Sequence, residues 1–396
     1  MENKKQSVDR KSLLKILVFS RYYRPAFLAG GPVVSIENLV KYLGKDFEFY
    51  IVTTDRDLED VNSFPNIERG KWHLVGNAKV RYLFPDEQNF NIVKKIVKEN
   101  GFKLIYLNSF WDPLFSIIPI ICIRFFIKTD IKILLAPRGE FFSNALKIKK
   151  IKKTLFLYFG MVSRLYKNIL WHATNQKEKE AIIKMFGQKS KTFLAPNLSV
   201  SEHLNNKGHI PREVGAPLRI CFISRIVKMK NLKFVLQVLS LVDVPIYLDI
   251  GGPQEDKVYW QECQFLANSL PKNIKVSYIG KIRPSDVPNT LAKYDLFFLP
   301  TLGENYGHVI IESLNAGTPV LISDRTPWRK LEKIGVGWDI PLEEKEIFAG
   351  RLDFLFKELP KNALERREMA KAYAKELIYD SKKIDQNKAM FYLAFS

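Results

Sequence analysis

The sequence contains few of the residues that usually build metal sites and disulfide frameworks. Its 396 residues include 3 Cys and 5 His. Cys122, Cys221 and Cys263 are far apart in the chain, so neither a disulfide framework nor a cysteine zinc site is expected. The sequence has no HExxH motif and no close cluster of His and Cys, so a zinc hydrolase has no support. We expect a reducing compartment and no bound metal.

The sequence also lacks an apolar run long enough to cross a bilayer. The longest run, residues 114–127, is interrupted by Pro119 and Arg124 and falls short of the roughly 20 residues that a membrane span needs. The apolar stretch 13–20 is too short and too rich in strand-forming residues for a signal peptide. We therefore expect a cytoplasmic protein in which residues 114–127 form a buried helix, with peripheral membrane contact left open.

Acidic residues are scarce in the first half of the chain. The whole sequence carries 62 Lys and Arg against 42 Asp and Glu, a net charge of +20. Residues 1–200 hold 34 basic and 18 acidic side chains, net +16, whereas residues 201–396 hold 28 and 24, net +4. Residues 141–170 contain seven cations, no acid and many apolar side chains. Such an excess favours an anionic partner, which a nucleic acid, a membrane surface or a phosphorylated ligand would each provide.

Short β-branched and aromatic runs alternate with helical patterns along the chain, which is typical of parallel sheets covered by helices. The length exceeds what one core usually covers, and residues 201–217 resemble an interdomain linker. We predict an α/β protein of two doubly wound, Rossmann-like domains, residues 1–203 and 204–379, facing each other across a cleft. A final helix, about residues 380–396, would either finish the second domain or cross back to the first. Strands are predicted at residues 14–20, 47–53, 80–84, 104–108, 131–136, 169–174 and 192–195 in the first domain and at 218–224, 246–250, 274–279, 296–301 and 320–323 in the second.

Ligands of doubly wound sheets bind at the carboxyl ends of the strands, in loops that lead into helices. These loops contain no GxxxxGK[ST] sequence, and no GxGxxG follows a strand, so P-loop enzymes and dinucleotide oxidoreductases lack support. Glu304 lies in the loop after strand 296–301, and Glu312 follows on the next helix. Backbone N–H groups between them, at the start of that helix, suit a phosphate. Taken alone, both glutamates fit solvated surface positions equally well.

Two further loops of the second half carry cations or small residues. Arg225 and Lys230 follow strand 218–224 and form a pair able to neutralise a diphosphate. Gly252 follows the next strand, and Gly280 and Lys281 follow the one after it, where a nucleotide could approach the backbone. Each loop taken alone also fits an ordinary basic or glycine-containing turn.

Together these motifs carry a resemblance. Ser-Arg-x4-Lys at 224–230, Gly-Gly-Pro at 251–253, Gly-Lys at 280–281 and Glu-x-Tyr-Gly-x4-Glu at 304–312 occur in this order. They resemble the C-terminal half of the family 4 retaining glycosyltransferases of the GT-B fold, of the bacterial cell-envelope and capsular polysaccharide type. The first half resembles this family more loosely, through Gly30-Gly31-Pro32 and Ala195-Pro196-Asn197.

The resemblance implies roles for the matching positions. Arg225 and Lys230 would bind the donor diphosphate and stabilise it as a leaving group. Glu304 would contact the transferred sugar near its anomeric centre, and Glu312 would bind the ribose hydroxyls. The other donor-binding positions would be Gly31, Gly252, Lys281, Ile282, Gly307, His308 and Val309. The resemblance further implies a UDP- or GDP-sugar donor, a lipid-linked or cell-envelope glycan acceptor, and a front-face mechanism without a metal or cofactor.

The chain departs from the family in the loop after strand 131–136. Many members carry a histidine there, whereas this loop contains Arg138 and Glu140. These two residues, with Asn108 at the end of another strand, are candidates for acceptor or sugar contacts. A buried ion pair or a charge at a helix N-terminus is the other interpretation of Arg138 and Glu140.

Two alternative functions remain open at this point. Another GT-B enzyme, such as a nucleotide-sugar epimerase or an inverting transferase, would differ in the anomer of its product. A basic nucleic-acid-binding protein would explain the charge, but the sequence has no recognition helix, RNA-binding motif or basic repeat. We therefore expect no nucleic-acid partner, and we expect the basic first half to attach the protein peripherally to the anionic inner face of the cell membrane.

Overall fold

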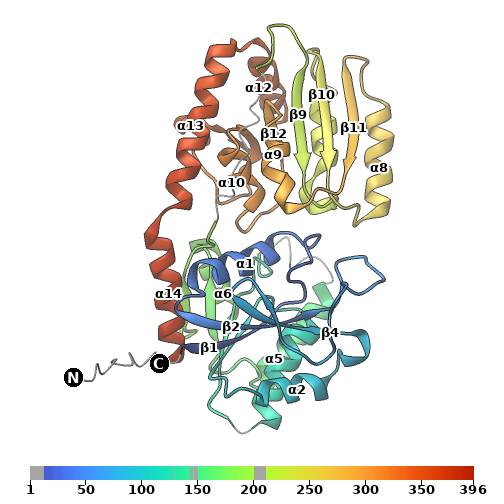
Figure 1. Cartoon of the computed structure of the whole chain (residues 1–396). Helices are drawn as coiled ribbons and strands as arrows, with labels where there is room; N and C mark the ends of the chain where they lie inside the picture. Colours follow the sequence, from blue (N-terminus) through green and yellow to red (C-terminus); the bar gives the residue numbers. More distant parts are fainter. Residues whose placement is uncertain (1–12, 128, 143–145, 147–149, 200–210) are drawn as a thin grey trace, which may run out of the picture.

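The computed structural model describes residues 13–127, 129–142, 146, 150–199 and 211–396. The chain forms two α/β domains, each built on a central sheet (Figure 1). The first sheet has the order β3-β4-β2-β1-β5-β6-β7-β8, with β3 antiparallel to β4, and the second has the order β11-β10-β9-β12-β13-β14 with parallel pairing. The strands are β1 (Leu14–Phe19), β2 (Phe47–Thr54), β3 (His73–Val75), β4 (Ala78–Leu83), β5 (Leu104–Leu107), β6 (Lys132–Leu135), β7 (Leu170–Ala173), β8 (Thr192–Leu194), β9 (Leu218–Ile223), β10 (Ile246–Gly251), β11 (Ile274–Gly280), β12 (Leu296–Leu299), β13 (Val320–Ser323) and β14 (Gly337–Ile340).

Helices cover both sheets. Those of the first domain are α1 (Gly31–Leu43), η1 (Pro85–Glu87), α2 (Phe90–Lys98), η2 (Pro113–Ile117), α3 (Ile118–Ile121), η3 (Cys122–Phe126), α5 (Lys150–Val162) and α6 (Gln176–Phe186). Those that follow are η4 (Lys228–Lys230), α7 (Leu232–Leu239), α8 (Lys257–Asn268), η5 (Pro284–Asp286), α9 (Val287–Leu291), α10 (His308–Asn315), α11 (Leu331–Ile334), α12 (Lys345–Lys357), α13 (Pro360–Ile378) and α14 (Ser381–Phe395).

The predicted strands are all present, and the structure adds two short strands at sheet edges, β3 and β14. β3 has three residues, too few to show an alternating pattern. β14 begins at Gly337, and glycine is depleted in strands, so the sequence gives no strand signal at this position. Residues 201–210 of the predicted linker lie outside the described residues.

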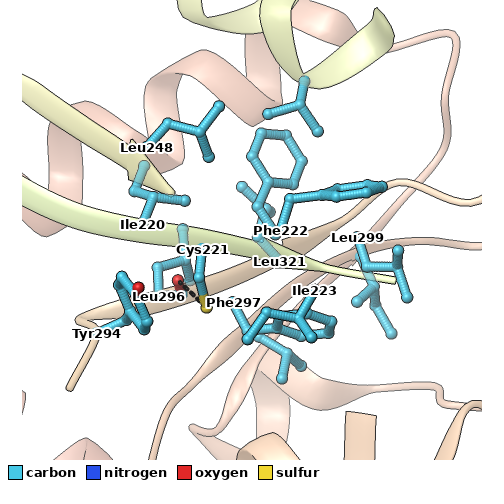
Figure 2. Close-up of a cluster of buried hydrophobic side chains, with 14 of the residues drawn as sticks. Ile220, Cys221, Phe222, Ile223, Leu248, Tyr294, Leu296, Phe297, Leu299 and Leu321 are labelled. Atoms are coloured by element: carbon cyan, nitrogen blue, oxygen red, sulfur yellow. Dashed lines mark hydrogen bonds between the residues drawn. The ribbon is translucent and has the colours of Figure 1, made fainter. Parts of the chain in front are cut away.

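Strand β9 shows why the second sheet could be predicted from apolar runs. Ile220, Cys221 and Phe222 are all fully buried, because helices cover both faces of the sheet (Figure 2). The three cysteines of the chain are buried and unpaired. This packed core holds the carboxyl ends of β9, β10 and β12 in fixed positions, and the loops that follow these strands line the cleft described below.

The C-terminal helix crosses back to the first domain. In Figure 1, α13 and α14 run as one red column along the side of both domains. α13 packs on α10, whereas α14 packs on α1, β6 and β8. The fully buried ring of Phe391 lies 5.5 Å from the rings of both Phe47 and Tyr106. The helix therefore completes the core of the first domain.

Residues 114–127 are helical, as predicted, but they are not buried throughout. They form consecutive π and α turns, η2, α3 and η3, in which Leu114, Phe115 and Ile120 are buried. Phe125 and Phe126 at the end are exposed. None of the helices in the described part of the chain combines the length and apolar character needed to cross a membrane.

Candidate functional site

A cleft of about 470 Å³ lies between the two domains, at the carboxyl ends of the strands. Its walls come from the loop before α1, the loop after β6, and the loops after β9, β10, β11 and β12. All of the predicted site residues line it except Lys281 and Asn108. The predicted residues in its wall are Gly31, Arg138, Glu140, Arg225, Lys230, Gly252, Ile282, Glu304, Gly307, His308, Val309 and Glu312.

Lys230 and Glu304 form an ion pair in the cleft. The Nζ of Lys230 bonds Oε2 of Glu304, and the two side chains are 14% and 16% exposed. The loop that carries Lys230 is tied to the loop after β12, because the carbonyl oxygen of Met229 accepts hydrogen bonds from Leu302 N (2.9 Å) and Thr301 Oγ1 (3.0 Å). These contacts between the two loops thus hold the cation and the carboxylate together.

Arg225 lies at the mouth of the cleft. Its Nη1 is 2.8 Å from Oε2 of Glu255, and both side chains are more than a third exposed. An exposed ion pair of this kind contributes at most about 1 kcal/mol, so it competes weakly with an incoming anion. The Arg225 guanidinium can therefore leave Glu255 and bind a ligand at a small cost in free energy.

The N-terminus of α10 points into the cleft. Gly307, which has a φ of 80°, is the N-cap residue of the helix, and His308 and Val309 follow in the cleft wall. The first N–H groups of a helix have no partner within it, and the helix dipole adds partial positive charge there. Glu312 lies one turn further along the helix and also lines the cleft. The helix start therefore offers N–H groups to an anion beside a carboxylate.

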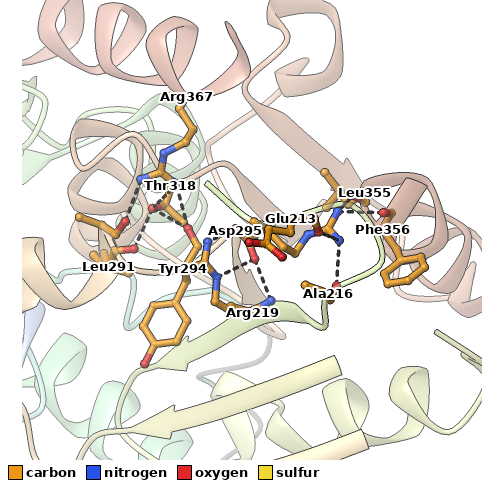
Figure 3. Close-up of polar contacts among 12 residues, drawn as sticks. Glu213, Ala216, Arg219, Leu291, Tyr294, Asp295, Thr318, Leu355, Phe356 and Arg367 are labelled. Atoms are coloured by element: carbon orange, nitrogen blue, oxygen red, sulfur yellow. Dashed lines mark hydrogen bonds and ion pairs between the residues drawn. The ribbon is translucent and has the colours of Figure 1, made fainter. Parts of the chain in front are cut away.

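The other end of α10 is held by a buried cation. Arg367 of α13 is almost fully buried and donates to the carbonyl oxygens of Tyr294 (2.8 Å), Ala292 (2.9 Å) and Ala316 (3.4 Å), as Figure 3 shows in part. Ala316 is the residue that caps the carboxyl end of α10. Burial lowers the pKa of the Arg367 guanidinium to about 10, so it stays charged at neutral pH. A cation at this end complements the helix dipole and fixes the direction of α10.

His308 contacts the first domain directly. Its Nε2 lies 3.0 Å from Ser35 Oγ on α1, and its ring packs beside Gly31. Burial, with a smaller effect of Arg138, lowers the pKa of His308 to about 3, so the ring is neutral at physiological pH. The sequence motif predicted a role for its backbone N–H only. The structure adds an interdomain contact made by its side chain.

Arg138 anchors a polar network beneath the first-domain wall of the cleft. Its guanidinium donates to Asn108 Oδ1 (2.7 Å), Asn197 Oδ1 (2.5 Å) and Tyr106 Oη (2.8 Å). His172 Nε2 lies 2.8 Å from Ala195 O, a group that only accepts, which makes Nδ1 the acceptor for the Tyr106 hydroxyl. Asn108 is therefore a buried partner of Arg138 rather than part of the cleft wall.

Glu140 is a half-buried carboxylate at the edge of the cleft. It accepts hydrogen bonds from Ser109 Oγ (2.9 Å), Phe110 N (2.6 Å) and Trp111 N (3.2 Å). Burial raises the pKa of Glu140 to about 7, against the opposing effect of these hydrogen bonds. The carboxylate thus holds the loop after β5 while it faces the cleft.

Lys281 pairs across the domain interface instead of lining the cleft. Its Nζ lies 3.6 Å from Oε2 of Glu59 in the first domain. Ile282, the next residue, does line the cleft and packs close to Gly251. Of this predicted pair, the structure therefore brings only Ile282 to the site.

Sequence reasoning missed a polar clasp between the domains, formed by Thr174, Asn175 and Asn305. Asn175 Nδ2 donates to Asn305 Oδ1 (2.9 Å) and Asn305 O (3.0 Å), and Asn305 Nδ2 donates to Thr174 Oγ1 (3.0 Å). Buried Glu178 accepts from Thr174 N (2.8 Å) and Gly139 N (2.6 Å). The clasp thus connects the loop that carries Arg138 with the residue next to Glu304. Asn305 lies inside the recognised motif, but nothing in the sequence indicates its partners.

The described residues contain no group of three or more His, Cys, Asp or Glu side chains arranged to hold a metal ion. The cleft gathers three cations, a helix N-terminus and three carboxylates between two Rossmann-like domains. This architecture is the GT-B fold, as the following comparisons show.

Residues 207–377 match the family model of the group 1 glycosyl transferases. Among solved structures, sucrose-phosphate synthase from Thermosynechococcus elongatus superposes with a TM-score of 0.67 at 14% identity, covering 96% of this chain and 99% of that one. HepE from Anabaena, in complex with UDP and glucose, superposes with a TM-score of 0.65 at 17% identity, covering 96% of this chain and 100% of that one. A mutant of TarM from S. aureus, in complex with Fondaparinux, alpha-GlcNAc-glycerol and UDP, superposes with a TM-score of 0.65 at 12% identity. The match covers 97% of this chain and 100% of that one. At these identities the likeness shows the fold.

A curated relative is a 41.2 kDa protein encoded in the cps region of Klebsiella pneumoniae, described as uncharacterized. It is 23% identical over 244 residues, which cover 59% of this chain. The chain spans 64% of the length of that relative. The solved structures thus show the GT-B fold for the chain, and residues 207–377 resemble the group 1 glycosyl transferases.

Proposed function

We propose that this chain is a retaining glycosyltransferase that moves a sugar from a nucleotide diphosphate sugar to a lipid-linked or cell-envelope glycan. One observation carries the proposal: Arg225, Lys230 and the start of α10 converge on the same cleft as Glu304 and Glu312. Cations and N–H groups suit the charge gained by a departing diphosphate, and a carboxylate suits the positive charge that develops on the sugar. The UDP in the complexes of HepE and TarM supports this kind of donor, with UDP- and GDP-sugars as the candidates.

In the proposed reaction, the bond between the anomeric carbon and the diphosphate oxygen breaks while the acceptor oxygen bonds the same face of that carbon. The electron pair of the broken bond leaves with the diphosphate, beside Arg225 and Lys230. The acceptor proton passes to the departing phosphate oxygen. Because the phosphate takes this proton, the step requires neither a protein base nor a divalent metal ion.

The Lys230–Glu304 ion pair would serve this step directly. A bound diphosphate offers Lys230 a second anionic partner, so the cation can bridge the leaving group and the carboxylate. Glu304 would then face the anomeric region of the sugar, and Glu312 would take the ribose hydroxyls. On the opposite wall, Arg138 and Glu140 are the candidates for contacts to the acceptor or the transferred sugar. We place the enzyme at the inner face of the cell membrane, in keeping with its basic first half.

Donor binding is expected to raise the melting temperature of the protein for one class of nucleotide sugar, with EDTA present throughout. A ligand at 1,000 times its Kd stabilises the folded state by about 4 kcal/mol. A thermal-shift panel of UDP-, GDP- and ADP-sugars measures this, and NMR of the product then gives its anomeric configuration. An inverted anomer would assign an inverting enzyme, and epimerised donor formed without acceptor would assign an epimerase. No stabilisation by any nucleotide sugar would contradict the proposal.

The polar clasp predicts coupling between the two domains during turnover. Asn305→Ala removes neutral hydrogen bonds worth roughly 1 kcal/mol each, so we expect the transfer rate to fall about 5- to 30-fold while the fold remains intact. Thr174→Val should lower the rate less, and the double variant should lose less than the product of the two single effects. Gln176→Ala is the matched control, because Gln176 is exposed and bonds Glu180 within its own helix. Strictly multiplicative effects in steady-state kinetics would show that the clasp does not act in turnover.

A further inference from the structure

Helix α5 carries apolar side chains on two of its faces. One face packs inward, where Phe156 and Leu157 contact the core of the first domain. The other face points to solvent: Leu155, Tyr158, Phe159 and Val162 are 64%, 68%, 76% and 69% exposed. The spacing of these four residues, i, i+3, i+4 and i+7, is the pattern by which helices usually bury one side. We call these four residues the outer stripe.

The outer stripe is a continuous surface rather than a set of scattered apolar residues. Met161, beside it on the same helix, is also 46% exposed. Phe125 and Phe126 on η3 are exposed as well, and Arg124 of η3 donates to the carbonyl oxygen of Lys167 in the turn after α5. Single exposed apolar side chains are normal on a protein surface, but a contiguous apolar patch marks a surface that meets a partner.

The charge around the outer stripe indicates the kind of partner. Residues 141–170 contain seven Lys and Arg and no Asp or Glu. Arg164 and Lys167, after the end of α5, are exposed. An apolar stripe on a helix that is followed by exposed cations fits an anionic lipid surface, where the apolar side chains enter the headgroup boundary and the cations meet lipid phosphates. A second copy of this chain fits poorly, because a symmetric contact would bring the same cations together.

The outer stripe is connected to the wall of the cleft that carries Arg138 and Glu140. We call this the acceptor wall. On the same helix, the Nζ of Lys153 lies 5.1 Å from the ring centre of Trp111. The backbone N–H of Trp111 donates to Glu140, which lines the cleft. A surface bound along α5 therefore adjoins the wall where we expect the acceptor.

We propose that the outer stripe of α5 docks on an anionic lipid bilayer and so presents the acceptor wall of the cleft to a lipid-linked acceptor. This inference rests on the proposed function for the acceptor, but the docking surface itself is defined by α5. The residues of the outer stripe do not line the cleft, so removing them leaves the donor site intact.

Flotation with vesicles of phosphatidylcholine alone, or of equal parts phosphatidylcholine and phosphatidylglycerol, tests the docking surface on the full-length chain. We expect binding to the anionic vesicles and a loss of about tenfold in Phe159→Glu and in Tyr158→Glu, since a charge on the stripe opposes insertion. Phe265→Glu on α8 is the matched control, because Phe265 is also 76% exposed but lies on the second domain. It should bind like the wild type.

Three results would overturn the inference: equal binding to neutral and anionic vesicles, equal loss in Phe159→Glu and Phe265→Glu, or a wild-type dimer that Phe159→Glu dissociates in size-exclusion chromatography. The thermal shift produced by the nucleotide sugar, measured without vesicles, should be the same in Phe159→Glu and the wild type. If this shift persists while vesicle binding fails, the docking surface is wrong and the donor assignment stands. If vesicle binding persists and no nucleotide sugar binds, the proposed function is wrong instead.

Discussion

Glu304→Gln is expected to lower the rate of sugar transfer by about 100- to 1,000-fold, the usual cost of removing one preorganised charge that stabilises a transition state. The amide keeps the shape of the side chain but leaves the positive charge on the sugar without its carboxylate. The effect should appear in kcat, because the charge develops during the reaction rather than on binding. Steady-state kinetics with the donor identified by thermal shift measure it.

The variant also leaves Lys230 without its partner in a largely buried position. Some loss of stability is therefore expected in Glu304→Gln, and the double variant Glu304→Gln/Lys230→Met should regain it while remaining inactive. Glu262→Gln is the matched control, since Glu262 pairs with Lys233 on an exposed surface (3.4 Å). Full activity in Glu304→Gln, or recovery of activity in the double variant, would remove Glu304 from the reaction.

Gly252→Ala should destabilise the second domain by roughly 3 kcal/mol or more, because two separate costs add at this position. Gly252 has a φ of 129°, which other residues rarely adopt, and an added Cβ would lie 2.0 Å from the carbonyl oxygen of Ser224. The clash is with backbone, so the loops after β9 and β10 must move apart. For a domain of this size, the melting temperature should fall by about 6–12 °C, measured by calorimetry.

The movement should also disturb donor binding, since Arg225 directly follows Ser224. We therefore expect the nucleotide-sugar thermal shift to be lost as well. Gly350→Ala in α12 serves as the control, because a Cβ there meets nothing within 4 Å and the helix interior favours alanine. Its melting temperature should stay the same or rise. A Gly252→Ala protein as stable as the wild type would show that the two loops separate easily.

Most strands and most of the cleft wall can be predicted from the sequence, because both depend on local patterns. Apolar runs mark strands covered on both faces, and the loops after them meet at one edge of a parallel sheet. The clasp between Asn175 and Asn305 could not be predicted this way, since it joins residues 130 positions apart. The contact of His308 with Ser35 is similar, because it depends on how the two domains close.

Asn108 shows a different limit of the sequence. The sequence pattern places Asn108 at the end of a cleft-facing strand, but its side chain turns inward to Arg138 and to the carbonyl oxygen of Pro32. A pattern of residue types does not say whether a polar side chain serves a ligand or the packing beneath it. Glu140 combines the two, because it holds the loop after β5 and still lines the cleft.

The return of α14 to the first domain has a consequence for the order in which the protein matures. Met390, Phe391 and Ala394 belong to the core beneath β1 and β2, yet they follow the whole of the second domain in the chain. During synthesis these residues emerge from the ribosome after the second domain, so the core of the first domain is completed only once the second domain has been made. Until then, the apolar face around Phe47 and Phe49 lacks the helix that covers it in the folded protein.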